Sequence, residues 1–153
     1  MTMERPETTG ETVVNAMSID VEDYFHVSVF DGLVPRSQWE SMESRVKANT
    51  LRLLEIFDQY GVRSTFFVLG WVGRRHPDLV HAIARAGHEV ASHGYAHRLI
   101  YDQTPAAFRE DVRRAKGILE QSAGRAVAGY RAPSYSITPR SLWALDILAE
   151  EGY

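Results

Sequence analysis

The 153-residue sequence contains no cysteine, which excludes disulfide bonds and metal sites built from thiolates. Any metal ion would have to be bound by histidine, aspartate or glutamate side chains. Neither sign of charge dominates, since 17 basic residues stand against 20 acidic ones and both are mixed along the chain. The sequence therefore has no basic stripe that could neutralise phosphates, and we do not expect a nucleic-acid partner.

Long apolar runs are missing as well. A membrane-spanning helix needs about 20 consecutive apolar residues, and no stretch of the sequence approaches that length. The first residues, "MTMERPETTGETVVNAM", lack the apolar run after basic residues that marks a secretory signal. We expect a flexible segment over residues 1–12, one domain over residues 13–153 and a cytoplasmic location, with action outside the cytoplasm left open.

The sequence does contain a regular alternation of short apolar segments with longer amphipathic ones. The short segments predict strands over residues 13–20, 63–70, 87–93 and 126–133. The longer segments predict helices over residues 37–61, 77–87, 104–124 and 138–152, each ending at a glycine. Their starts are marked by the capping-box pattern Ser37-x-x-Glu40 and by prolines at the first helical position, Pro77, Pro105 and Pro139.

Strands that alternate with helices imply an α/β fold with parallel strands and right-handed crossovers. The fold would be a barrel or an open doubly wound sheet, and in both the ligand site lies at the carboxyl ends of the strands. The last residues, Glu151-Gly152-Tyr153, fall where this pattern would begin its next strand. We therefore expect the domain to be truncated on its C-terminal side.

Ionisable residues follow three of the predicted strands, in "SIDVEDYFHV", "SHGYAH" and "YRAPSYS". The first supplies the carboxylates Asp20, Glu22 and Asp23, and the second supplies His93 and His97. Two histidines and a carboxylate can hold a divalent ion while leaving positions for water and substrate, which suits metal-assisted hydrolysis.

Each of these patterns also has a plainer interpretation. A single His-x-x-x-His pair arises by chance, the acidic cluster could be a solvated loop start, and Arg131-x-Pro133 could be a turn with an ion pair. Their convergence on one rim of a parallel sheet favours a site. His26 is a reserve ligand because it lies close to the acidic cluster. The other histidines and the large aromatic residues are expected to serve as caps, solvated surface or core: His76, His81, His88, Trp39, Trp71, Trp143, Phe66 and Phe67.

These motifs resemble a known family. "SIDVEDYF", "TFFVLGWV", "HPDLVHAIARAGHEVASHGYAH" and "GYRAPSYSIT" are similar to the polysaccharide deacetylases of the NodB-homology type, carbohydrate esterase family four. The likeness runs from about Ser18 to the last residue, and it is strongest to the branch associated with exopolysaccharide and exosortase (PEP-CTERM) loci. The resemblance implies the N-terminal portion of a distorted (β/α) barrel and removal of N-acetyl groups from an acetylated polysaccharide or oligosaccharide.

The resemblance also implies roles for single residues. Asp20 matches the general base, and His93 and His97 match two metal ligands. The third ligand would be Glu22, with Asp23 as the less favoured alternative, because Val21 occupies the place where many members carry an aspartate. The remaining matches are Arg131, which would orient Asp20, Pro133 in the groove wall, the Ser134 amide at the oxyanion, and Tyr24 near the substrate. The implied cofactor is one divalent ion, zinc first, with cobalt or nickel as alternatives.

The family has two later motifs, one with a further aspartate and a Leu-x-His, and neither is found between the Arg131-x-Pro133 motif and Tyr153. We therefore expect the chain to bind metal but to turn over substrate weakly or not at all, and its incomplete sheet could lead to homo-oligomers. Two alternative functions stay open, an amidohydrolase acting on a small cyclic amide or imide, and a catalytically incomplete glycan-binding module.

Overall fold

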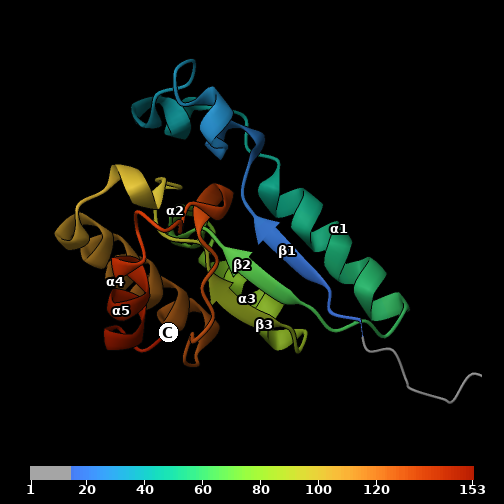
Figure 1. Ribbon diagram of the computed structural model, residues 1–153. Helices are drawn as coiled ribbons and strands as arrows, with labels where there is room; N and C mark the ends of the chain where they lie inside the picture. The colour runs from blue at the N-terminus through green and yellow to red at the C-terminus, as the bar shows by residue number, and fades with distance from the viewer. Residues whose placement is uncertain (1–14) are drawn as a thin grey trace, which may run out of the picture.

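The computed structural model describes residues 15–153, which form a three-stranded parallel sheet surrounded by helices (Figure 1). The strands are β1 (Ser18–Val21), β2 (Thr65–Val68) and β3 (Glu89–Ser92), in the order β1-β2-β3. Asp20 pairs with Phe67, and Phe67 pairs with Ala91, so the three strands end at the same edge of the sheet. The predicted α/β fold with parallel strands is confirmed.

Five α-helices and five short 3-10 helices connect and flank the strands in residues 15–153. The α-helices are α1 (Val46–Gln59), α2 (Gly70–Arg75), α3 (Pro77–Arg85), α4 (Pro105–Ala123) and α5 (Trp143–Glu150). The 3-10 helices are η1 (Tyr24–His26), η2 (Ser28–Phe30), η3 (Arg36–Ser41), η4 (Ile100–Asp102) and η5 (Pro133–Tyr135). No helix within this part of the chain is both long enough and apolar enough to cross a membrane.

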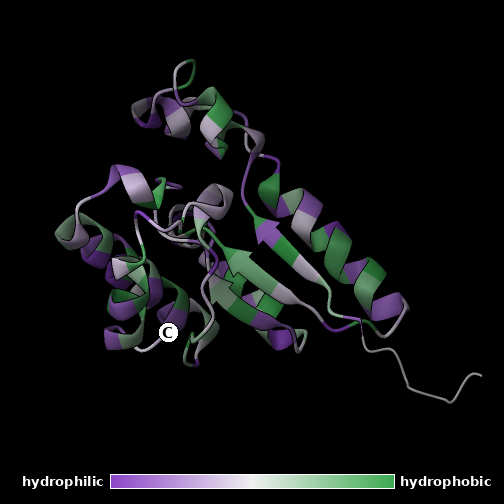
Figure 2. Cartoon of the chain, viewed as in Figure 1, coloured by the Kyte–Doolittle hydropathy of each residue, from purple (hydrophilic) through white to green (hydrophobic). Residues whose placement is uncertain are grey.

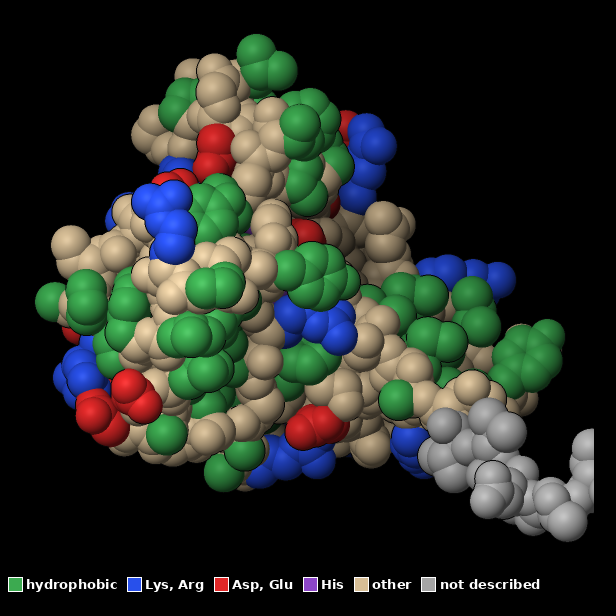
Figure 3. Space-filling view, viewed as in Figure 1, with side chains coloured by type: hydrophobic (Ala, Val, Ile, Leu, Met, Phe, Trp, Pro, Cys, Tyr) green, Lys and Arg blue, Asp and Glu red, His purple; other side chains and the backbone are tan. Residues whose placement is uncertain are grey.

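Two apolar clusters hold these elements together. The main core joins the sheet to α1, α2, α3 and the end of α4, and Phe66, Leu79 and Ile83 are completely buried within it. A second cluster joins α4 to α5 through Phe108, Val112 and residues of α5. Figure 2 shows hydrophobic residues along the strands and on the helices that flank them. On the face seen in Figure 3, charged side chains of both signs are scattered among apolar and polar ones.

The helix ends marked by local motifs lie close to where the sequence predicts them. Pro77 occupies the first turn of α3, and Gly87 beyond its end has a φ of 82°. The Oγ1 atom of Thr104 accepts a hydrogen bond from the Ala107 amide at 3.2 Å, which caps α4, and Gly124 ends that helix with a φ of 69°. Both glycines take the left-handed conformation that favours glycine after a helix.

The predicted start of the first helix is wrong. Ser37 and Glu40 lie in η3, the backbone becomes extended at Met42, and α1 begins only at Val46. The α1 terminus is capped by Asp23, whose Oδ1 accepts hydrogen bonds from the amides of Arg45 (2.8 Å) and Val46 (3.0 Å). A cap that comes from more than 20 residues away leaves no local pattern in the sequence.

The last predicted helix also begins later than expected, at Trp143. In the preceding segment the Ser141 hydroxyl accepts a hydrogen bond from the Thr138 amide at 2.9 Å and donates one to the Ser136 carbonyl at 3.0 Å. These side-chain bonds hold a turn where Thr138-Pro139 predicts a helix start.

Three strand predictions need correction. The segment 126–133 forms only a single parallel bridge, between Tyr130 and Ser92, and then turns into η5. The second strand ends at Val68, and helix α2, which the sequence analysis missed, begins at Gly70. For the first strand, residues 13 and 14 lie outside the described part of the chain, and the strand itself begins at Ser18.

Candidate metal centre

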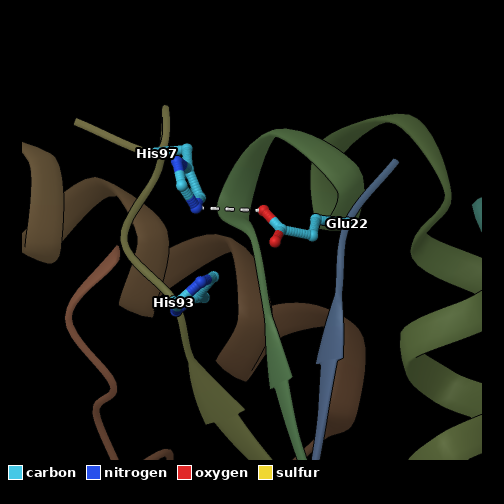
Figure 4. A group of neighbouring side chains, drawn as sticks. All are labelled: Glu22, His93 and His97. Atoms are coloured by element: carbon cyan, nitrogen blue, oxygen red, sulfur yellow. Dashed lines mark ion pairs between the residues drawn. The ribbon is translucent and has the colours of Figure 1, made fainter. Parts of the chain in front are cut away.

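Three predicted ligands meet at the carboxyl ends of the strands. Glu22 follows β1 directly, His93 follows β3 directly, and His97 lies further along the loop after β3. Figure 4 shows their side chains pointing toward one another. One ligand atom from each residue lies within 4.8 Å of the other two, and Glu22 Oε2 is 3.2 Å from His97 Nε2. Within residues 15–153, Glu22, His93 and His97 form the group of histidines and carboxylates whose ligand atoms lie close enough together to hold a metal ion.

His93 is fixed by main-chain atoms of β2 and of the segment that precedes η5. Its amide donates a hydrogen bond to the Val68 carbonyl at 3.0 Å, which continues the pairing of β2 and β3. Its Nδ1 atom is 2.8 Å from the Arg131 carbonyl. A carbonyl oxygen can only accept, so Nδ1 carries the proton and Nε2 is left with a free lone pair. Burial lowers the pKa of His93, which keeps the ring neutral as a metal ligand must be.

His97 is fixed by side chains instead. Its backbone has a φ of 49°, which is unusual for a residue other than glycine. The Ser28 hydroxyl lies 3.4 Å from Nδ1 of the ring, so that Nε2 faces Glu22. Burial, and then the neighbouring His93, lower the pKa of His97 to about 4.

Glu22 carries the atom that most directly indicates a cation. Its Oε2 atom is buried and no group of the described residues meets it in hydrogen-bond geometry, although His97 Nε2 lies 3.2 Å away. Burial, and then the negative charge of Asp20, raise the pKa of Glu22 to about 7. A buried carboxylate oxygen without a hydrogen bond is costly unless a positive charge neutralises it. Together with two neutral imidazoles it forms a donor set that fits a divalent ion.

Asp20 and Arg131 form an ion pair beside this group. Arg131 Nη1 donates to Asp20 Oδ1 at 2.6 Å, Nη2 donates to the Ser18 hydroxyl at 2.7 Å, and the guanidinium lies 3.9 Å from the centre of the Phe67 ring. Because side chains alternate along a strand, Asp20 and Glu22 point to the same face. The Asp20 side chain is 36% exposed and can therefore reach water.

The predicted substrate residues are placed in two different environments. Pro133 is buried, and Ser134 has a left-handed backbone with φ 48° and ψ 34°. The Ser134 hydroxyl is 3.3 Å from that of Ser28, which joins Ser134 to the His97 side of the centre. Tyr24 instead packs against Phe25, and the centre of its ring lies 5.2 Å from the Arg45 guanidinium carbon.

The structure separates Asp23 and His26 from the three-residue group. Both carboxylate oxygens of Asp23 are used at the start of α1, since Oδ2 also accepts from the Ser44 hydroxyl at 2.7 Å. His26 Nδ1 accepts a hydrogen bond from the Asp23 amide at 2.8 Å, and the ring packs between Trp39 and Trp71. Burial lowers the pKa of His26 to about 3, so His26 is a neutral core residue.

Three residues near His97 were not singled out from the sequence: Ser28, Arg36 and Asp111. Ser28 contacts the His97 ring, and the other two bind the main chain of the loop that carries it. They come from the segment after β1 and from α4, far from His97 in sequence. Neither spacing nor residue type distinguishes them from ordinary surface residues, so only the fold could reveal them.

Ionisable side chains gathered at the carboxyl ends of parallel strands are typical of an α/β domain with its ligand site at the strand ends. The family model for polysaccharide deacetylase matches residues 33–151. The chain therefore belongs to the polysaccharide deacetylase family, as its motifs predict.

Individual relatives agree with this assignment. The chain is 31% identical over 98 residues to a peptidoglycan-N-acetylglucosamine deacetylase of Bacillus cereus, covering 63% of this chain and 36% of that protein. It is 29% identical over 97 residues to a chitooligosaccharide deacetylase of Bradyrhizobium, covering 63% of this chain and 42% of the relative. The chain thus spans less than half the length of both relatives.

Solved structures confirm the fold. A crystal structure from Mycobacterium smegmatis, assigned as a polysaccharide deacetylase, matches with a TM-score of 0.73 and 32% identity, over 90% of this chain and 48% of that chain. The family 4 carbohydrate esterase of Streptomyces lividans, solved with acetate, matches with a TM-score of 0.67 and 20% identity, over 90% and 58% of the two chains. The predicted deacetylase-type barrel fold is therefore correct for this part of the domain.

Proposed function

We propose that the chain carries the metal-binding part of an N-deacetylase that acts on an acetylated polysaccharide or oligosaccharide, with zinc as the expected ion. The observation that supports this most directly is the meeting of Glu22, His93 and His97 around a buried carboxylate oxygen that makes no hydrogen bond. Zinc is bound by this type of donor set, and cobalt and nickel are alternatives with similar ligand preferences.

When bound, a divalent ion polarises a carbonyl oxygen and makes a water molecule more acidic. Asp20 would accept a proton from the attacking water, because its side chain is partly exposed. The hydrogen bond of 2.6 Å from Arg131 Nη1 to Asp20 Oδ1 would fix the orientation of the carboxylate. The Ser134 amide would donate a hydrogen bond to the oxyanion that develops on the acetyl group. The water oxygen forms the new bond to carbon, the carbon–nitrogen bond breaks as the nitrogen takes up a proton from solvent, and acetate and an amine are released.

The substrate class is supported by the names of the relatives. One acts on peptidoglycan N-acetylglucosamine and another on chitooligosaccharides, which are both glycans with N-acetyl groups. We assign no residue of this chain to protonation of the leaving amine, and we expect slow acetate release from the chain on its own. A cyclic amide would need a different substrate fit and is the alternative that substrate screening tests.

The experiment is a zinc titration of the wild-type chain beside His93→Ala and His97→Ala, followed by acetate release from an N-acetylated chitooligosaccharide. The proposal predicts about one zinc ion per wild-type chain, because three protein ligands form one site, and loss of that ion in both variants. Folded variants that bind as much zinc as the wild type would contradict it. Zinc binding without acetate release, even from a form of the protein extended to the length of its relatives, would favour the glycan-binding alternative, and ring opening of a cyclic imide would favour the other.

A further inference from the structure

The loop between the two histidines has a conformation that its own sequence does not secure. His97 adopts a φ of 49° and Gly94 a φ of 73°. For a residue with a β-carbon, the left-handed conformation is unfavourable, so surrounding contacts must hold it. Two of these contacts are main-chain bonds to the start of α2, where the Gly70 amide donates to the Gly94 carbonyl (2.8 Å) and the Trp71 amide to the Tyr95 carbonyl (3.0 Å).

Two side chains of opposite charge bind the rest of the loop. Asp111 of α4 accepts a hydrogen bond from the Tyr95 amide at 2.7 Å. Arg36 donates from Nε to the Ala96 carbonyl at 2.8 Å and from Nη2 to the His97 carbonyl at 3.3 Å. The Asp111 carboxylate thus accepts from a main-chain N–H group, and the Arg36 guanidinium donates to two main-chain carbonyls. Each charged group therefore meets main-chain partners of complementary polarity.

Arg36 is itself held in place. Its Nη2 atom is 3.2 Å from Asp31 Oδ2, and its guanidinium lies 5.6 Å from the centre of the buried Trp39 ring. Arg36 belongs to η3, in the segment between β1 and α1 that Figure 1 shows beyond the carboxyl ends of the strands. Arg36 is thus held by Asp31 and Trp39 as well as by the loop. It differs in this from an exposed surface ion pair, which contributes little to stability.

We propose that Arg36 is a positioning residue for His97: it holds the loop in the conformation in which His97 Nε2 faces Glu22. The inference rests on the proposed metal centre, since it states how that centre is kept in shape. It also explains why arginine is needed. Lysine would bring the same charge but cannot present two N–H groups in a fixed plane to two neighbouring carbonyls.

The test compares zinc affinity, by competition with a chelator, in the wild type, Arg36→Gln, Arg36→Lys and Arg52→Gln. Arg52 is the matched control because, within residues 15–153, it pairs with Glu55 on the surface of α1 and with no other acidic side chain. We expect Arg36→Gln to weaken zinc binding about 10-fold to 100-fold, the range seen when an outer partner of a metal ligand is removed. Arg36→Lys should fall between it and the wild type, and Arg52→Gln should match the wild type.

Two further readouts separate positioning from general destabilisation. The visible spectrum of the cobalt-loaded protein should change in Arg36→Gln, because that spectrum reports the geometry of the ligands. Amide hydrogen exchange at residues 95–98 of the metal-free protein should become faster in Arg36→Gln and stay unchanged in Arg52→Gln.

Zinc affinity, cobalt spectrum and loop protection that stay at wild-type values in Arg36→Gln would overturn the inference, while loss of zinc in His97→Ala would still uphold the metal centre. Equal losses in Arg36→Gln and Arg52→Gln would also overturn it. If the wild type binds no zinc, the proposed function fails, and the exchange of residues 95–98 alone then decides whether Arg36 holds the loop.

Discussion

His93 and His97 lie four residues apart, yet the protein holds them in different ways. His93 directly follows strand β3, and main-chain carbonyls of Val68 and Arg131 fix both its amide and its ring. His97 sits on a loop, and the side chains of Ser28 and Arg36 hold it from positions 69 and 61 residues away. The sheet therefore builds one half of the centre, and long-range side-chain contacts build the other.

This difference suggests where the centre is vulnerable. Main-chain hydrogen bonds of a parallel sheet survive most side-chain substitutions, whereas a loop held by single side chains loosens when one of them is removed. Substitutions around His97 should therefore change metal affinity with little loss of global stability.

The adjacent carboxylates Glu22 and Asp23 should give opposite results when each is replaced by alanine. Glu22→Ala should reduce zinc affinity by more than the roughly 100-fold that loss of an outer partner costs, with little change in stability, because its buried Oε2 makes no hydrogen bond. Asp23→Ala should lower the free energy of unfolding by about 2–3 kcal/mol, since it leaves the amides of Arg45 and Val46 unpaired.

Zinc titration and urea unfolding of the two variants measure both effects. Loss of zinc binding in a folded Asp23→Ala protein, with normal binding in Glu22→Ala, would reverse the assignment of the ligand.

The acid stability of the metal-free protein should depend on His26. Burial lowers its pKa to about 3 in the folded state, below the value of about 6.5 expected in the unfolded chain. The unfolded state therefore takes up a proton that the folded state does not, and stability is lost as the pH falls below about 6.5. Between pH 6.5 and 4.5 this loss amounts to about 2 kcal/mol.

His26→Phe keeps an aromatic ring in the cluster but cannot bind a proton. Urea unfolding at several pH values should show that the free energy of unfolding falls less steeply with decreasing pH in the variant than in the wild type. Parallel curves for the two proteins would show that His26 is not a neutral core residue.

Asp111→Asn tests the opposite side of the loop from Arg36. Asparagine can still accept from the Tyr95 amide, but a neutral acceptor forms a weaker bond than a carboxylate. We expect about a 10-fold loss of zinc affinity, at the lower end of the range for outer partners. Asp146→Asn on α5 is a suitable control, and an equal loss of affinity in both variants would contradict the assignment.

Ser28→Ala should have the smallest effect, because the contact with His97 Nδ1 is long, at 3.4 Å. We expect zinc affinity to fall by about 10-fold or less and stability to change little. A chelator competition assay measures the change, with Ser41→Ala in η3 as a control on the same segment. A larger effect from Ser41→Ala would show that Ser28 does not orient the ring.

Local patterns predicted much of this architecture. Pro77 and Gly87 mark the start and end of α3, and Thr104 and Gly124 mark those of α4. Each could be predicted because it acts within one helical turn. The strand ends alone indicated His93, His97 and a set of three carboxylates, since parallel strands bring their carboxyl ends to one edge, and the resemblance to the family then favoured Glu22 as the third ligand. The start of α1 could not be found, because its cap is Asp23, and neither could the contacts of Arg36, because both depend on residues distant in the chain.

The most direct test of the metal centre is an anomalous diffraction measurement at the zinc absorption edge, on crystals of the zinc-loaded protein. We expect one strong peak between Glu22, His93 and His97, at about 2.0–2.2 Å from both Nε2 atoms and a Glu22 oxygen. A peak beside Asp23 or His26, or well-ordered crystals with no peak between the two histidines, would contradict it.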